Sequence, residues 1–68
     1  MPLDVHKFGL AILDLEPGEV IAIEKITGGY QCFRIMRREP LKMRVWVAIE
    51  SNEHLSDAKF ASLPSGHL

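Results

Sequence analysis

Five cations and a tryptophan lie close together in the middle of the chain. They are Arg34, Arg37, Arg38, Lys42, Arg44 and Trp46. Cationic side chains bind phosphate and aromatic rings stack on bases, so this combination is typical of surfaces that hold single-stranded nucleic acid. The candidate RNA-binding residues are Arg34, Arg38, Lys42, Arg44 and Trp46, with Tyr30 near them. Two alternatives remain open: a solvated outer sheet face, and a protein interface, where tryptophan and arginine are enriched.

Catalytic and metal chemistry finds little support in the sequence. The serines lack a nucleophile-elbow setting, and the histidines and Cys32 lack the paired spacings of zinc modules. Asp14 and Glu16 alternate on one face of an extended segment, but acids that keep an edge strand soluble are the commoner reason for such a pair. We therefore expect no enzyme, no metal and no cofactor.

The chain has 68 residues, which predicts a single domain over residues 1–68 with a flexible tail from about residue 64. A chain this short buries only about 60% of its unfolded surface and often needs a disulfide, a metal or a partner. Because Cys32 is the only cysteine, we expect a homodimer. The formal net charge is −1, so no whole-molecule basic field attracts nucleic acid.

Hydropathy gives no sign of a membrane or a secreted protein. No apolar run approaches the ~18 residues of a membrane span, and the first residues lack a secretory pattern. We expect a cytoplasmic protein with no membrane partner.

Periodicity and turn residues predict a small, mainly β protein. The predicted strands are Phe8–Leu13, Val20–Ile26, Tyr30–Arg37, Lys42–Glu50 and a short one at His54–Leu55. Pro17-Gly18 and Gly28-Gly29 separate them as turns. A helix over Val5–Leu15 is the alternative for the first strand. Ser56 is a suitable N-cap for a helix over Asp57–Leu63, so the expected fold is a five-stranded antiparallel sheet or barrel with a short C-terminal helix.

The segment Lys42–Glu50 separates into two faces. Leu41, Met43, Val45, Val47 and Ile49 fall on one face, which predicts the core, while Lys42, Arg44 and Trp46 fall on the other. A loop at Glu39–Leu41 that pairs Arg38 with Lys42 sets core residues opposite core residues. The same register predicts Phe33 opposite Val47, Ile35 opposite Val45, Met36 opposite Arg44, and the Arg34 guanidinium over the Trp46 ring.

Two segments carry a resemblance to a known family. Leu10–Ile23 (LAILDLEPGEVIAI) and Met43–Val47 (MRVWV) resemble the carbon storage regulator (CsrA/RsmA) family, which has an aliphatic strand, Thr-Arg-Arg, Gly-Glu, a second aliphatic strand and later Val-Arg-Ile-Gly-Val. The resemblance covers about Leu10–Leu63, with extra residues around Glu24–Gly28. It implies an intertwined homodimer of five-stranded chains that binds GGA-containing mRNA leaders and controls translation.

The chain departs from that family at the usual RNA-binding positions. Asp14-Leu15-Glu16 replaces Thr-Arg-Arg, Asp57 replaces an arginine near the last helix, and Arg44 alone matches in kind. Acids repel phosphate. One hypothesis is therefore a translational regulator that binds mRNA through a shifted basic face. The other is a diverged homologue that has lost RNA binding and acts through protein contacts or dimerisation.

Overall fold

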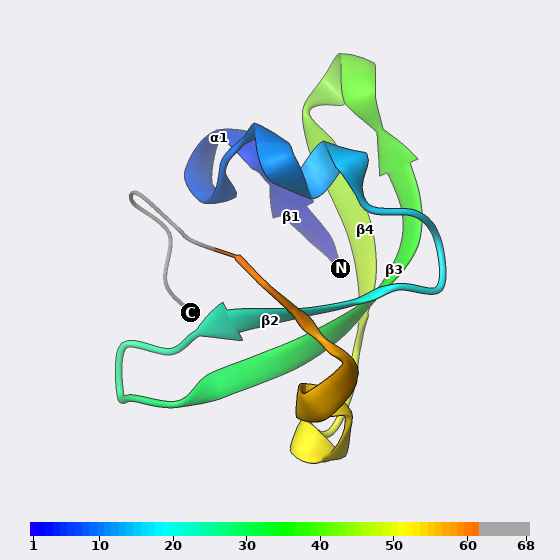
Figure 1. The fold of residues 1–68 in the computed structure, drawn as a ribbon. Coiled ribbons are helices and arrows are strands. Elements are labelled where there is room, and N and C mark those ends of the chain that lie inside the picture. The colour runs from blue at the N-terminus through cyan, green and yellow to red at the C-terminus, as the bar shows by residue number, and fades with distance from the viewer. Residues whose placement is uncertain (62–68) are drawn as a thin grey trace.

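The computed structural model describes residues 1–61, apart from the side chains of Leu10 and Ala11. Five strands form one sheet in the order β1-β4-β3-β2-β5 (Figure 1). They are β1 (Pro2–Asp4), β2 (Val20–Glu24), β3 (Tyr30–Glu39), β4 (Arg44–Ile49) and β5 (Lys59–Phe60). The mainly β, five-stranded prediction is confirmed. The sheet is open and mixed rather than an antiparallel barrel, because β5 runs parallel to β2.

The helical segments are short. They are α1 (Val5–Phe8) and the 3₁₀ helices η1 (Leu10–Asp14), η2 (Pro40–Lys42) and η3 (Asn52–Asp57). Within residues 1–61, no helix combines the length and the apolar character that crossing a bilayer requires.

Strands β2, β3 and β4 form the antiparallel meander that the sequence predicts. The turn before β2 closes with a hydrogen bond from the Glu19 N–H to the Glu16 carbonyl at 3.1 Å, and Gly18 supplies its positive φ of 93°. Gly28 and Gly29 adopt φ of 97° and 75° in the turn between β2 and β3. Both predicted turns are confirmed, because each needs a residue that tolerates positive φ.

The predicted strand Phe8–Leu13 is wrong, because this segment is helical. The Asp4 carboxylate accepts a hydrogen bond from the His6 N–H at 2.9 Å and caps α1, and Gly9 ends α1 with φ of 89°. The helix alternative is right in kind, but Gly9 divides it into α1 and η1. Val5, Phe8, Ile12 and Leu15 follow helical spacing and are all buried.

The predictions for the C-terminal part are also wrong. His54-Leu55 lies in η3 rather than in a strand, and Ser51 rather than Ser56 takes the N-cap position. The first residues of the predicted helix Asp57–Leu63 end η3 and form β5, where backbone pairing with β2 outweighs the capping signal. The rest of that helix and the predicted tail lie outside the described residues.

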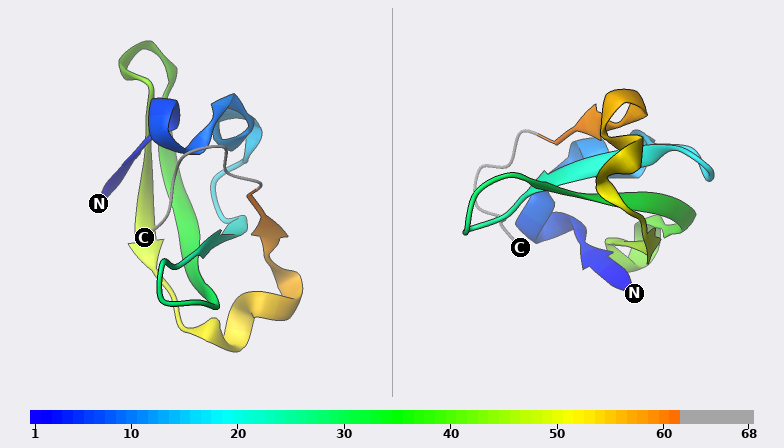
Figure 2. Two further views of the ribbon diagram at one scale, coloured as in Figure 1. Left: turned by 90° about the vertical axis from the view of Figure 1, so that its left-hand side faces the viewer. Right: turned by 90° about the horizontal axis from the view of Figure 1, so that it is seen from below.

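The core lies mainly on one face of the sheet, which we call the inner face. Its buried side chains come from α1, η1 and the inward positions of the strands: Leu3, Val5, Phe8, Ile12, Leu15, Ile21, Ile23, Phe33, Ile35, Val45 and Val47. The other face, the outer face, buries Val20, Ala22 and Cys32 under Leu55 and Ala58. Helices α1 and η1 lie at the end of the sheet that carries the β3–β4 turn, and η3 lies at the opposite end (Figure 2). None of the helices in residues 1–61 covers the outer face near the β3–β4 turn (Figure 2).

The β3–β4 register differs from the predicted one. Ile35 lies opposite Val47 and Arg37 opposite Trp46, so Met36 is an extra residue that forms a β-bulge. The strands reverse through η2, and Met43 adopts a left-handed conformation with φ of 54°, so Glu39 rather than Arg38 begins the pairing. Each of the predicted cross-strand pairs is therefore wrong. Val45 and Val47 are buried as predicted, while Leu41 and Ile49 are exposed in the turn and at the strand end.

Candidate functional site

The outer face of the β3–β4 hairpin carries the densest group of charged side chains around an aromatic ring. We call this group the Trp46 cluster; it consists of Arg37, Glu39, Lys42, Arg44 and Trp46. The register sets Arg37 opposite Trp46 and Glu39 opposite Arg44, so these four side chains share one face. Lys42 joins them from η2. The bulge at Met36 produces this arrangement, because it moves the charged end of β3 by one residue.

The Glu39 carboxylate is the centre of the Trp46 cluster. Its Oε1 accepts a hydrogen bond from Trp46 Nε1 at 2.7 Å and lies 3.4 Å from Arg37 Nη2. Its Oε2 lies 3.5 Å from Arg44 Nη2 and 3.9 Å from Lys42 Nζ. One carboxylate therefore holds three cations and fixes the indole ring.

The Arg37 guanidinium lies over the Trp46 ring, 4.6 Å from its centroid. The predicted partner, Arg34, is wrong, because the bulge replaces it with Arg37. A cation over an exposed indole contributes about 0.5–1 kcal/mol and holds the ring against the sheet. The Arg37 side chain is 63% exposed, so the outer plane of the guanidinium stays open to solvent.

Glu39 is charged in spite of its partial burial. Desolvation alone would raise the pKa of Glu39, but the Trp46 hydrogen bond and the charges of Lys42, Arg44 and Arg37 outweigh it and lower the pKa. The Glu39 Oε2 atom is buried and accepts no hydrogen bond from the described residues, among which the ion pairs to Arg44 and Lys42 compensate its charge.

An apolar hollow of about 410 Å³ adjoins the Trp46 cluster. It is lined by Met1, Met36, Arg37, Trp46, Val47 and Ala48. Met1 and Met36 are 47% and 58% exposed, although both are large and hydrophobic. An aromatic ring, two methionines and a stacked arginine thus surround one open depression on the outer face.

Two of the predicted site residues lie elsewhere. Arg34 binds Glu50 through Nε at 2.8 Å and the Gly18 carbonyl through Nη1 at 2.8 Å. Arg38 points to the other side of the sheet, where Nη1 binds the Leu13 carbonyl at 2.9 Å. Arg34 therefore ties two loops to β3 and Arg38 ties η1 to it, so of the five predicted residues Lys42, Arg44 and Trp46 are the ones that come together.

The sequence reasoning missed Arg37 as a site residue and Glu39 altogether. Arg37 and Glu39 alternate along β3 beyond Met36, and this alternation was the available signal. Their side chains lie on the outer face only if a bulge precedes them. Tyr30, the other aromatic candidate, packs edge-on against Phe60 at 5.0 Å and lies apart from the cluster, at the other end of β3.

The acids that depart from the family pattern lie away from the Trp46 cluster. Glu16 pairs with Arg38 at 3.5 Å, and Asp57 lines a cleft together with Arg34 and His54. Asp4, which is not one of these departures, does lie close to the cluster, opposite Arg44 in the β1–β4 pairing. Three cations against Glu39 and Asp4 leave this region mildly positive.

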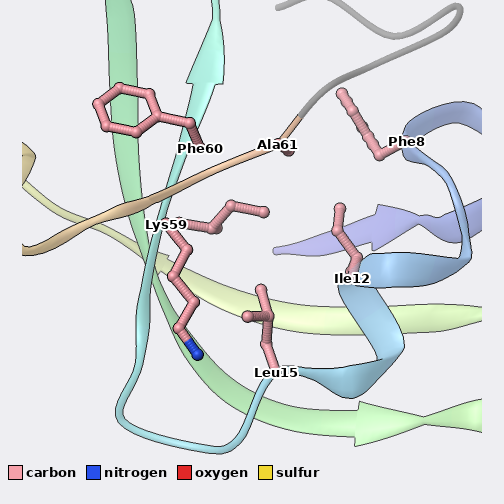
Figure 3. A pocket seen from close by; sticks show the side chains of 7 residues that line it. Phe8, Ile12, Leu15, Lys59, Phe60 and Ala61 are labelled. Atoms are coloured by element: carbon pink, nitrogen blue, oxygen red, sulfur yellow. The ribbon is translucent and has the colours of Figure 1, made fainter.

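A second hollow, of about 320 Å³, lies on the inner face. It is lined by Phe8, Ile12, Leu15, Ile21, Lys59, Phe60 and Ala61 (Figure 3). Among the described residues that line it, Lys59 is the one ionisable group, and it forms an ion pair with Glu19. The hollow lies between η1 and β5, and its described lining is otherwise apolar.

Metal and thiol chemistry have little basis in the described residues. In residues 1–61, no three His, Cys, Asp or Glu side chains lie together in a group that could hold a metal ion. Cys32 is buried, and desolvation, with a smaller effect of the Glu50 charge, raises the pKa of its thiol. A thiol held in its protonated form is a poor nucleophile.

Comparison of the chain with protein-family models, curated proteins and solved structures finds no match.

Proposed function

We propose that the protein binds single-stranded RNA through the Trp46 cluster and the hollow beside it, and that it regulates translation of the bound mRNA. The observation that carries this proposal is the convergence of Arg37, Lys42 and Arg44 on the Glu39 carboxylate, which also accepts a hydrogen bond from Trp46, the only tryptophan of the chain. The resemblance to the carbon storage regulator family supports the same function.

Each group in the cluster has a role in such binding. The Arg37 guanidinium, stacked on the indole, presents a flat outer plane on which a base can stack. The hollow between Met36 and Ala48 gives room for a second base. Lys42 and Arg44 lie where the sugar-phosphate chain would pass and neutralise its charge. Bases bound this way are held by stacking, which tolerates many sequences.

Titration of the protein with RNA tests the proposal, because Trp46 is the only tryptophan and its emission reports on the site directly. We expect a GGA-bearing hairpin and an unstructured oligonucleotide to change this emission at low salt. Two phosphate contacts, to Lys42 and Arg44, predict a slope of log K against log salt of about −1.4 for single-stranded RNA. Arg37→Ala and Arg44→Ala should each weaken binding about tenfold.

Lys25→Ala is the matched control, because Lys25 lies in the turn at the other end of β3 (Figure 1). It removes one cation and should leave affinity unchanged. Absence of any emission change or gel retardation for the unaltered protein at low salt contradicts the proposal.

A second candidate is favoured by the exposed methionines. Met1, Met36 and Ala48 form an apolar rim around Trp46 and Arg37, which is the composition of a protein-interface centre. A second copy of this chain is the partner of this candidate, in line with the homodimer expected from chain length. Sedimentation without RNA distinguishes the two: a dimer that Met36→Glu dissociates supports the interface, whereas a monomer at micromolar concentration contradicts it.

A further inference from the structure

We propose that Glu39 is a built-in competitor for the phosphates of the ligand, so that the Trp46 cluster rejects single phosphates and accepts only a chain of them. This inference rests on the proposed function and names the regulation of the same site.

The competitor role follows from which charges Glu39 already holds. Arg37, Arg44 and Lys42 lie within 3.4–3.9 Å of its carboxylate oxygens. A phosphate carries the same sign of charge and the same kind of acceptor oxygen as a carboxylate. It must therefore draw these cations away from Glu39, or share them with it, in order to bind.

The cations do not leave the two carboxylate oxygens of Glu39 equally easily. Oε1 keeps the Trp46 hydrogen bond at 2.7 Å whatever the cations do. Oε2 has only the pairs to Arg44 and Lys42, at 3.5 and 3.9 Å, and it is buried without a hydrogen bond. The side chains of Arg44 and Lys42 are exposed and turn outward readily. A phosphate that binds these two cations therefore replaces Oε2 as their partner.

Leaving Oε2 unpaired sets a threshold for binding. A buried charge that loses its partners costs free energy, and one weak phosphate contact does not offset that cost. Several phosphates in one chain, together with a base stacked on Arg37, offset it collectively. We therefore expect the cluster to bind an oligonucleotide more tightly than a mononucleotide or inorganic phosphate. The difference in affinity should be larger than the number of contacts alone would give.

Glu39→Gln tests the inference. The Gln side-chain oxygen still accepts the Trp46 hydrogen bond, while the competing charge is gone. We expect the variant to bind an RNA oligonucleotide about tenfold more tightly than the unaltered protein, and adenosine monophosphate to bind measurably only to the variant. Trp46 emission in the free protein checks that the ring stays in place.

Two further variants separate charge from other causes. Glu16→Gln changes net charge by the same amount but acts on Arg38, on the inner side of the sheet, and should leave affinity within about twofold. Glu39→Asp keeps the charge and should not tighten binding.

The outcomes separate the inference from the proposed function. If the unaltered protein binds RNA and Glu39→Gln binds equally or more weakly, the competitor role is wrong while the function stands. If only Glu39→Gln binds, the competitor role is supported and the unaltered chain is not an RNA-binding protein. If neither binds, both proposals are wrong.

Discussion

At the residue scale, the Glu39 carboxylate joins the other side chains of the Trp46 cluster: Arg37, Lys42, Arg44 and Trp46. The sequence pointed to Lys42, Arg44 and Trp46, and these three lie together. It assigned Arg34 to the indole, whereas the structure places Arg37 there. Residue types follow directly from the sequence, but contacts across two strands depend on a register that one extra residue changes.

Cys32 gives a direct prediction at this scale. Its thiol is fully buried and its pKa is raised, so the thiolate is scarce at neutral pH and the sulfur is shielded from reagents. We expect Ellman's reagent to react with the native protein far more slowly than with the protein in denaturant. Rapid reaction in the native state would show that η3 does not keep the outer face closed over Cys32.

At the element scale, the meander was predictable and the edges of the sheet were not. A Pro-Gly turn precedes β2, a Gly-Gly turn joins β2 to β3, and β4 carries clear alternation. The edge strands β1 and β5 have three and two residues, which is too short for any periodicity to show. They form because β4 and β2 provide them with backbone hydrogen-bond partners. The sequences of β1 and β5 alone do not show that these partners are present.

The break at Gly9 gives a prediction at the element scale. Gly9 has φ of 89° and ψ of 157°, a conformation that is almost confined to glycine. We expect Gly9→Ala to lower the free energy of unfolding by about 1–3 kcal/mol through backbone strain, since a Cβ there meets no neighbouring atom. If α1 and η1 formed one continuous helix, Gly9→Ala would instead raise the free energy of unfolding by up to ~1 kcal/mol.

D-alanine at position 9 is the matched control. It adds the same methyl group but favours positive φ, and a chain of 68 residues is accessible to chemical synthesis. Chemical denaturation of the three proteins gives the comparison. If L-alanine stabilises the protein, α1 and η1 form one helix in solution.

At the scale of the whole molecule, one chain builds its own core. The buried residues of both faces come from the described part of a single chain, residues 1–61. An association through the exposed hollow would then join two finished subunits, in contrast to the intertwined dimer that the family resemblance implies.

Met36→Glu separates these two kinds of dimer. The residue is exposed at the bulge, so we expect its replacement to leave the melting temperature nearly unchanged. We also expect the melting temperature of the variant to stay constant over about two orders of magnitude in protein concentration, because Met36→Glu dissociates subunits that meet at the hollow. A melting temperature of the variant that still rises with concentration would show an association that does not depend on the hollow, as in a core shared between chains.

Acid stability is a further property of the whole molecule. The Lys59 hydrogen bond, with the Glu16 N–H, lowers the pKa of Glu19, and the Trp46 cluster lowers that of Glu39. A carboxyl with a lowered folded-state pKa adds stability that is fully present above its unfolded value, about 4.3 for glutamate, and that is lost as pH falls through the folded value. We expect the unfolding free energy to drop below about pH 4.3, and to drop less in a Glu19→Gln/Glu39→Gln double variant. The unfolding free energy is measured by urea denaturation at each pH. An equal loss of this free energy with falling pH in the two proteins would contradict the prediction.

The bulge at Met36 has a consequence for the gene as well as for the sheet. Ile35 already lies opposite Val47, and Arg37 already lies opposite Trp46. An in-frame deletion of codon 36 would therefore remove the bulge and leave every other β3–β4 pair in register. Loss of a codon farther from the bulge, such as that of Cys32, would instead reverse inside and outside for part of the strand. A single-codon deletion scan of β3 should therefore recover soluble protein best at this position.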